Sequence, residues 1–104
     1  MGDNMANKRL SKKGYIYLLV NKDGLYKYGC TRRTPAGRTK RINYENTKYS
    51  EFNLIDSYKS NDIFKSECDL KWSLWASHMA LSEYFTGDYG LILHIFNAEK
   101  LKHE

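Results

Sequence analysis

The stretch GYIYLLVNKDGLYKYGC, residues 14–30, decides the fold. Residues 15–20 are a run of aromatic, β-branched and leucine side chains, which is typical of a strand, and residues 25–30 resume the extended pattern. Between these two runs lies a short polar segment that ends in an Asp-Gly pair, which tolerates positive φ angles. The stretch therefore predicts a β-hairpin.

The segments after the hairpin predict a helix and a third strand. Thr34 can cap a helix, and Pro35 suits its first position, where the backbone N–H of a helix has no partner to lose. We expect this helix to run from Pro35 to about Glu45, with Ile42 facing inward. Residues 51–59 alternate imperfectly between apolar and polar side chains, which indicates a third strand in a small antiparallel sheet.

Residues 62–81 form the longest predicted helix. Two neighbouring stripes at helical spacing give it a broad apolar face: Ile63, Glu67, Leu70, Leu74 and His78, then Phe64, Cys68, Lys71, Trp75 and Met79. We expect Trp72 and Trp75 to lie in the core rather than to stack on bases, and His78 to be structural.

The end of the chain completes the predicted order of elements. Residues 83–87 interrupt the helical pattern, and Asp88 can cap a last helix, with a strand at residues 91–96 as the alternative. The order ββαβαα predicts an α/β (α+β) fold in which a three-stranded antiparallel sheet is flanked by helices. Residues 1–12 hold little that can be buried and are expected to be a mobile basic arm, and residues 13–104 are expected to be a single domain.

The charge of the chain favours a polyanionic partner. Of its 104 residues, 17 are Lys or Arg and 12 are Asp or Glu, which gives a net charge of +5. The cations concentrate after the hairpin turn and on the first predicted helix, at Lys27, Arg32, Arg33, Arg38, Lys40 and Arg41. Nucleic acid is therefore the expected partner, ahead of acidic proteins and neutral metabolites.

Cysteine usage and hydropathy argue against a secreted or membrane protein. Cys30 and Cys68 do not form the framework of a disulfide-rich secreted domain. No apolar run is long enough to cross a bilayer, and the start of the chain lacks the apolar stretch of a signal peptide. We expect a soluble intracellular protein, in the cytoplasm, nucleus or nucleoid, whose two thiols are buried and inert.

Four features, taken in order, resemble the GIY-YIG nuclease superfamily over residues 14–86. Tyr15-Ile16-Tyr17 is similar to the first tripeptide of that family, and Lys27-Tyr28-Gly29 to the second, with Lys27 in place of the usual tyrosine as in some branches. Arg38 matches the catalytic arginine of the family and Glu67 its metal-binding glutamate. Glu83-Tyr84-Phe85 also resembles an element of a phage-type branch. The resemblance implies a three-stranded antiparallel sheet flanked by helices, and an endonuclease that hydrolyses DNA with one divalent ion, Mg²⁺ or Mn²⁺.

The resemblance also implies roles for individual side chains. Tyr17 is the expected general base, and Lys27 on the adjacent strand is expected to face it and to lower its pKa. Arg38 is expected to hold a phosphate and to stabilise the transition state, with Arg41 as the alternative. Contacts to other phosphates are expected from Arg32, Arg33, Lys40 and Arg41.

Glu67 stands on an apolar stripe, where a carboxylate needs a partner. A magnesium ion is a suitable partner because it keeps most of its water and needs few protein ligands. The alternative is an ion pair with Lys71, four residues further along the helix.

Departures from the family pattern leave a second function open. The family often has a histidine near the second tripeptide, and the phage-type branch has one a turn after the glutamate, whereas this chain offers Cys30 or Thr31, and Lys71. The alternative function is therefore a catalytically impaired DNA-binding module, and a protein-interaction domain is a third. A chain of this length has little room for a sequence-reading domain, which leaves three alternatives open: low specificity, a homodimer, or a partner that supplies specificity. Tyrosines that could either stack on bases or cover the third strand are Tyr44, Tyr49 and Tyr58.

Overall fold

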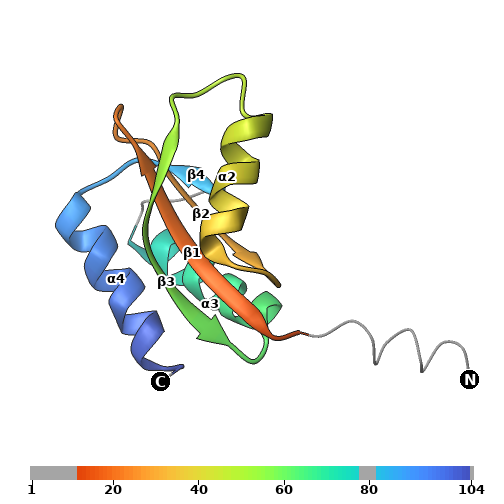
Figure 1. Ribbon diagram of the computed structural model, residues 1–104. Helices are drawn as coiled ribbons and strands as arrows, with labels where there is room; N and C mark the ends of the chain where they lie inside the picture. Colours follow the sequence, from red (N-terminus) through yellow and green to blue (C-terminus); the bar gives the residue numbers. More distant parts are fainter. Residues whose placement is uncertain (1–11, 78–81, 104) are drawn as a thin grey trace, which may run out of the picture.

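The hairpin predicted from residues 14–30 is present as strands β1 (Gly14–Asn21) and β2 (Tyr26–Thr31) of a computed structural model, which describes residues 12–77 and 82–103 (Figure 1). Gly24 has a φ of 78° in the turn, a conformation that glycine adopts without strain. The side chain of Asn21 accepts hydrogen bonds of 3.0 Å from the backbone N–H groups of Asp23 and Leu25. The turn is therefore held by its own polar residues.

The sheet has four antiparallel strands in the order β3-β1-β2-β4. β3 (Phe52–Ser60) is the third strand that the sequence predicts, shifted by one residue. β4 (Tyr84–Phe85) pairs with Tyr26 and Lys27 of β2. The antiparallel α+β fold is confirmed, but the three-stranded sheet and the order ββαβαα are wrong, because a two-residue strand is too short to show an alternating pattern.

Three helices begin where local capping predicts. α2 (Pro35–Glu45), α3 (Ile63–Ala76) and α4 (Tyr89–Leu101) follow Thr34, Asp62 and Asp88, whose side chains accept from backbone N–H groups three residues on. The helix at residues 91–96 rules out the alternative strand there.

Two predictions fall wholly or partly beyond the described residues. α3 ends at Ala76 with Ser77 as its cap, so the predicted helix to residue 81 is too long at least at Ser77. Residues 78–81, and with them His78 and Met79, lie outside the described residues, as does the arm at residues 1–11.

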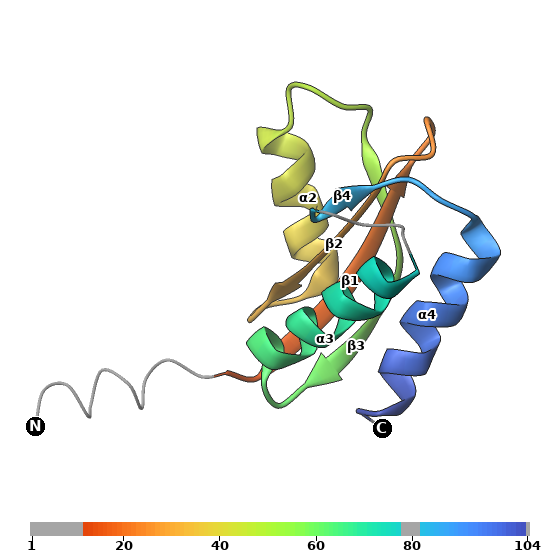
Figure 2. The same cartoon turned by 180° about the vertical axis from the view of Figure 1, so that it is seen from behind.

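The helices form a layer on each face of the sheet. α2 lies on one face, against β1 and β3, and α3 lies on the other with α4 beside it (Figures 1 and 2). Side chains of β1 alternate between the two layers, so Ile16 and Leu18 pack under α3 and α4 while Tyr17 and Leu19 pack under α2. The hairpin is thus the central piece of both halves of the core.

A bulge explains the imperfect alternation of β3. Leu18 pairs with Asp56 but Leu19 pairs with Leu54, so Ile55 is an extra residue. An extra residue reverses which face the next side chain points to. Phe52 consequently belongs to the core under α2, whereas Tyr58 belongs to the core under α4.

The outer side of α3 does not match the prediction. Its buried residues are Ile63, Ser66, Leu70 and Leu74. Phe64 and Trp75 of the second apolar stripe are exposed instead, at 51% and 52%, and Trp72 is 55% exposed. The expectation that Trp72 and Trp75 lie in the core is therefore wrong. Cys68 is exposed as well, so the expectation that both thiols are buried is wrong for this one. Within the described ranges, no helix is long and apolar enough to cross a membrane.

Candidate functional site

Tyr17 and Arg38 meet under α2. Tyr17 is 2% exposed, pairs with Gly29 across the hairpin, and extends its phenol over that glycine. Arg38, one turn into α2, is a hydrogen-bond partner of the phenol. The two residues that the sequence assigns to base and phosphate binding are therefore neighbours.

The pKa of Tyr17 is shifted in the direction opposite to the expectation. Burial raises the pKa of Tyr17, and this outweighs the hydrogen bond and the positive charge of Arg38, which lower it. The charge of Glu83 raises it further. The expectation that Lys27 faces Tyr17 and lowers its pKa is wrong, because the cation beside the phenol is Arg38.

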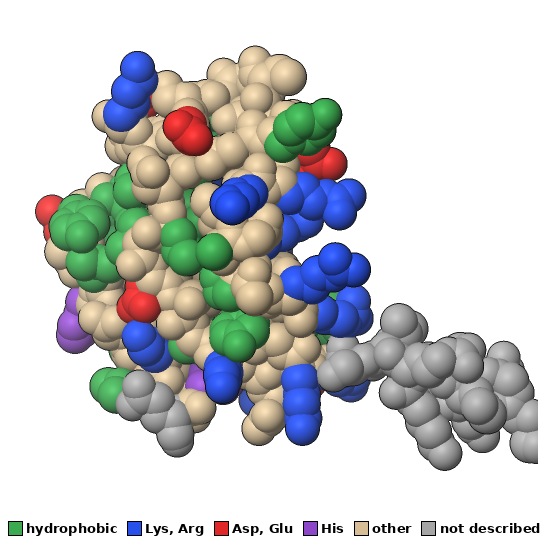
Figure 3. Space-filling view, in the orientation of Figure 1, with side chains coloured by type: hydrophobic (Ala, Val, Ile, Leu, Met, Phe, Trp, Pro, Cys, Tyr) green, Lys and Arg blue, Asp and Glu red, His purple; other side chains and the backbone are tan. Residues whose placement is uncertain are grey.

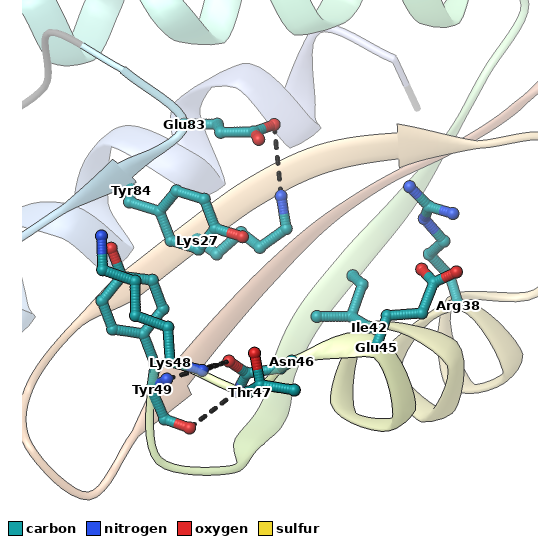
Figure 4. Close-up of a pocket in the computed structure, with 10 residues that line it drawn as sticks. All are labelled: Lys27, Arg38, Ile42, Glu45, Asn46, Thr47, Lys48, Tyr49, Glu83 and Tyr84. Carbon is teal, nitrogen blue, oxygen red and sulfur yellow. Dashed lines mark hydrogen bonds and ion pairs between the residues drawn. The ribbon is translucent and has the colours of Figure 1, made fainter.

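Lys27 has different partners. It pairs with Leu19 in the sheet, is 5% exposed, and its Nζ lies 3.2 Å from Oε2 of Glu83. The same Nζ lies 4.7 Å from the ring centre of Tyr84, close enough for a cation–π interaction. A buried ammonium is stable only with such compensation. Figure 4 shows Lys27 reaching toward Glu83 across the Tyr84 ring.

Lys27 and Arg38 line opposite parts of one pocket. This pocket measures about 500 Å³ and is also lined by Tyr49, Glu45 and Glu83 (Figure 4). Tyr49, for which the sequence leaves base stacking or covering open, packs against Tyr84 at 5.3 Å between ring centres. The other two tyrosines differ in exposure: Tyr44 is 89% exposed, whereas Tyr58 is buried.

A second pocket, of about 650 Å³, carries most of the predicted phosphate contacts. Its lining residues are Cys30, Thr31, Arg32, Arg33, Thr34, Gly37, Arg38 and Arg41. Figure 3 shows Lys and Arg side chains gathered along the edge where α2 begins. Lys40 is exposed on α2 but does not line this pocket. The fold therefore brings four arginines together and leaves Lys40 apart.

Arg38 belongs to both pockets, and one of its donors is not used. Its Nε is buried and has no hydrogen-bond partner among the described residues. Arg41, the alternative, is 70% exposed, with its Nε 3.6 Å from Glu45. An unpaired buried donor is uncommon because it costs about 1–3 kcal/mol. Arg38 thus has a buried donor for which residues 12–77 and 82–103 supply no acceptor.

Glu67 approaches the hairpin from the opposite face. It is half-buried on α3, and its carboxylate accepts a hydrogen bond from the Cys30 thiol on β2. Burial raises the pKa of Cys30 to about 11, helped by Glu67 and opposed by the charges of Arg32 and Arg38. Cys30 therefore contacts Glu67 and also lines the pocket of the four arginines.

The surroundings of Glu67 fit a cation held by few protein ligands. Within the described part of α3, the ion pair joins Lys65 to Asp69 at 3.9 Å and does not involve Glu67 with Lys71. The thiol that contacts Glu67 carries no charge to neutralise a carboxylate. No cluster of three or more metal-ligating side chains occurs among residues 12–77 and 82–103. An ion held by Glu67 would need water and substrate oxygens to complete its shell.

Two site residues have no role assigned from the sequence. Glu83 pairs with Lys27, and Cys30 contacts Glu67. A lysine inside a predicted strand could have indicated that an acidic partner was needed. The contact between Cys30 and Glu67 depends on how α3 packs on the sheet, for which the sequence carries no local signal.

Comparisons with protein-family models, with curated proteins and with solved structures find no match. The resemblance to GIY-YIG nucleases therefore stays a prediction from the motif residues.

Proposed function

We propose that the protein is a divalent-metal-dependent endonuclease that hydrolyses phosphodiester bonds in DNA. One observation carries the proposal: Arg38 lies beside the Tyr17 phenol with a buried, unpaired Nε, at the junction of two pockets. A phosphate oxygen is the acceptor that suits a guanidinium best, because two parallel N–H groups can hold it.

In this proposal Arg38 binds the scissile phosphate. Negative charge increases on the phosphate oxygens in the transition state, and a fixed guanidinium in a partly buried site stabilises it. Arg32, Arg33 and Arg41 line the same pocket and would hold neighbouring phosphates.

Tyr17 is proposed to orient the attacking water and to accept its proton. Because burial raises the pKa of Tyr17 above its usual value, the protonated phenol predominates near neutral pH. Contact with Arg38 opposes that shift. The reaction is therefore expected to speed up as the pH rises and the phenolate fraction grows.

Glu67 is proposed to hold one Mg²⁺ or Mn²⁺ ion. Such an ion supplies Lewis acidity at the phosphate and stabilises the leaving oxygen. Lys27 is proposed to act at a distance, as a buried positive charge fixed by Glu83 at the wall of the pocket.

A DNA-binding module without catalysis is the second candidate. The raised pKa of Tyr17 favours it, since a protonated phenol cannot accept a proton from water. This version keeps the four-arginine pocket and gives salt-dependent binding without strand scission.

Nicking of supercoiled plasmid distinguishes the two candidates. The wild-type protein is expected to nick in Mg²⁺ or Mn²⁺ and not in EDTA. Arg38→Ala and Glu67→Ala are expected to lose at least about 100-fold in rate, the effect of removing one transition-state contact. Lys40→Ala is the matched control, since Lys40 is an exposed cation on the same helix that lines neither pocket, and it should lose less than about 10-fold. Equal residual nicking by all variants would contradict the proposal.

A further inference from the structure

The outer face of α3 carries a line of exposed aromatic rings. Phe64, Trp72 and Trp75 are each more than half exposed, and the two indoles contact each other edge to face at 5.4 Å between centres. Cys68 is exposed between them. These positions follow one side of the helix, away from its buried face. Three large aromatic side chains on one line of surface indicate a binding function more often than single exposed residues do.

One end of this line touches the arginine pocket. The guanidinium of Arg32 lies 5.3 Å from the ring centre of Phe64. Arg32 lines the same pocket as Arg38. The aromatic face is thus continuous with the surface proposed to hold phosphates.

Glu67 stands beside the same line. Phe64 precedes it by three residues and Lys71 follows it by four, so both are its neighbours on the helix surface. From Phe64 to Trp75 the line extends about 16 Å along α3, at about 1.5 Å per residue. That length accommodates about five stacked nucleotides, spaced about 3.4 Å apart.

The charges around the line favour a polyanion over an apolar protein partner. Arg32 lies at one end, Lys71 is exposed beside the rings, and Lys65 is exposed on their other side, paired with Asp69 at 3.9 Å. The chain as a whole carries a net charge of +5. Aromatic rings flanked by cations are the arrangement with which proteins bind single-stranded nucleic acid, because each base presents a flat face for stacking.

We propose that this face of α3 stacks unpaired bases of the substrate strand, so that the substrate is DNA with a single-stranded part next to the cleaved bond. A continuous duplex does not fit this role, because its base faces are already stacked inside the helix. The inference rests on the proposed nuclease for its cleavage step. Binding of the unpaired strand stands by itself and is measured without metal.

The tryptophans report directly on this binding. The chain contains two tryptophans, and both lie on the proposed face. In EDTA, titration with an oligothymidylate of about 12 nucleotides is expected to quench their fluorescence, because a base stacks on the indole. A blunt duplex of equal length is expected to quench much less at the same degree of binding. This measurement uses the wild-type chain and depends on no variant.

Substitution of the tryptophans provides the second part of the test. Trp72→Ala/Trp75→Ala is expected to weaken binding of fluorescein-labelled oligothymidylate by about 10- to 100-fold, with duplex binding changed by less than about 3-fold. Tyr89→Ala is the matched control, since Tyr89 is an exposed aromatic residue at the start of α4, outside the line. Circular dichroism checks that each variant keeps its fold.

Each contrary result has a defined meaning. Absence of quenching at saturation, equal quenching by duplex, or a change in self-association instead of strand affinity would overturn the inference. Plasmid nicking without such quenching would leave the nuclease standing and remove this face from it. Quenching without any nicking would support strand binding by this face and contradict the proposed nuclease.

Discussion

The phenol of Tyr17 lies directly over the backbone of Gly29, its partner on the neighbouring strand. A Cβ atom on Gly29 would lie 2.6 Å from Cζ of Tyr17, closer than real side-chain contacts allow. Residue 29 is thus glycine because the phenol of Tyr17 occupies the space that a side chain at this position would need.

Gly29→Ala is expected to destabilise the protein by about 1–3 kcal/mol, the usual effect of overfilling a packed core. It should also displace the phenol from Arg38 and lower the nicking rate. Urea unfolding measures the first effect. Gly90→Ala at the exposed start of α4 is the control, and it should change the free energy of unfolding by less than about 1 kcal/mol. Similar losses in the two variants would show that Gly29 is not specifically required.

The proposed role of Tyr17 predicts a dependence on pH. Since its pKa is raised by burial, the phenolate fraction grows about tenfold per pH unit below the pKa, and the single-turnover rate should rise in parallel between about pH 7 and 9. Tyr17→Phe should abolish most of the activity. Tyr15→Phe, on the same strand and lining a different pocket, should retain it. A Tyr17→Phe variant with normal rates would remove Tyr17 from the mechanism.

The pair of Lys27 and Glu83 predicts non-additive stability changes. Glu83→Gln leaves the buried ammonium without a counter-charge and is expected to cost about 1 kcal/mol, a modest value because the Glu83 side chain is 54% exposed. Adding Lys27→Met removes the stranded charge and should recover part of that loss. A double-mutant cycle by urea unfolding tests the coupling. Strictly additive changes would show that the ion pair contributes nothing.

Tyr58 predicts how stability changes at high pH. Its hydroxyl is buried without a hydrogen-bond partner in the described part of the chain, and burial, followed by the charge of Glu99, raises its pKa. A raised pKa means that the folded protein holds this proton more tightly than the unfolded chain does. The contribution of Tyr58 to folding stability is therefore fully present below about pH 10, the pKa of tyrosine in the unfolded chain. It is lost as the pH rises above that value.

Tyr58→Phe should accordingly reduce the slope of melting temperature against pH above about pH 10. At pH 7 it should be neutral or stabilising by up to about 1 kcal/mol, because it removes an unpaired buried hydroxyl. A loss of more than about 2 kcal/mol at pH 7 would mean that the hydroxyl is bonded.

The sequence predicts what depends on neighbouring residues. The starts of α2, α3 and α4 are correct because a capping side chain bonds to a backbone N–H three residues away. The hairpin is correct for the same reason, since Asn21 to Gly24 carry the turn within themselves. The sequence does not predict strand β4, because this strand exists only through its pairing with β2.

Side-chain directions were harder to predict because they depend on register and packing. A turn centred one residue earlier would place Lys27 opposite Tyr17, whereas the observed turn places Gly29 there. Either apolar stripe of α3 could have faced the sheet, and the position of α3 relative to the sheet and α4 decides which one does. Arg38 and Glu67 could be named from the motif, but not the Cys30 thiol that contacts Glu67.

The central claim is that Arg38 and Glu67 act on one phosphate from opposite faces of the hairpin. A crystal of the protein with an uncleaved oligonucleotide and Mn²⁺ tests this most directly, through the anomalous signal of the ion. The account predicts an ion within about 2.3 Å of a Glu67 oxygen, bridging to a phosphate that Arg38 also contacts. An ion bound elsewhere, with Glu67 still bonded to Cys30 and no phosphate at Arg38, would contradict it.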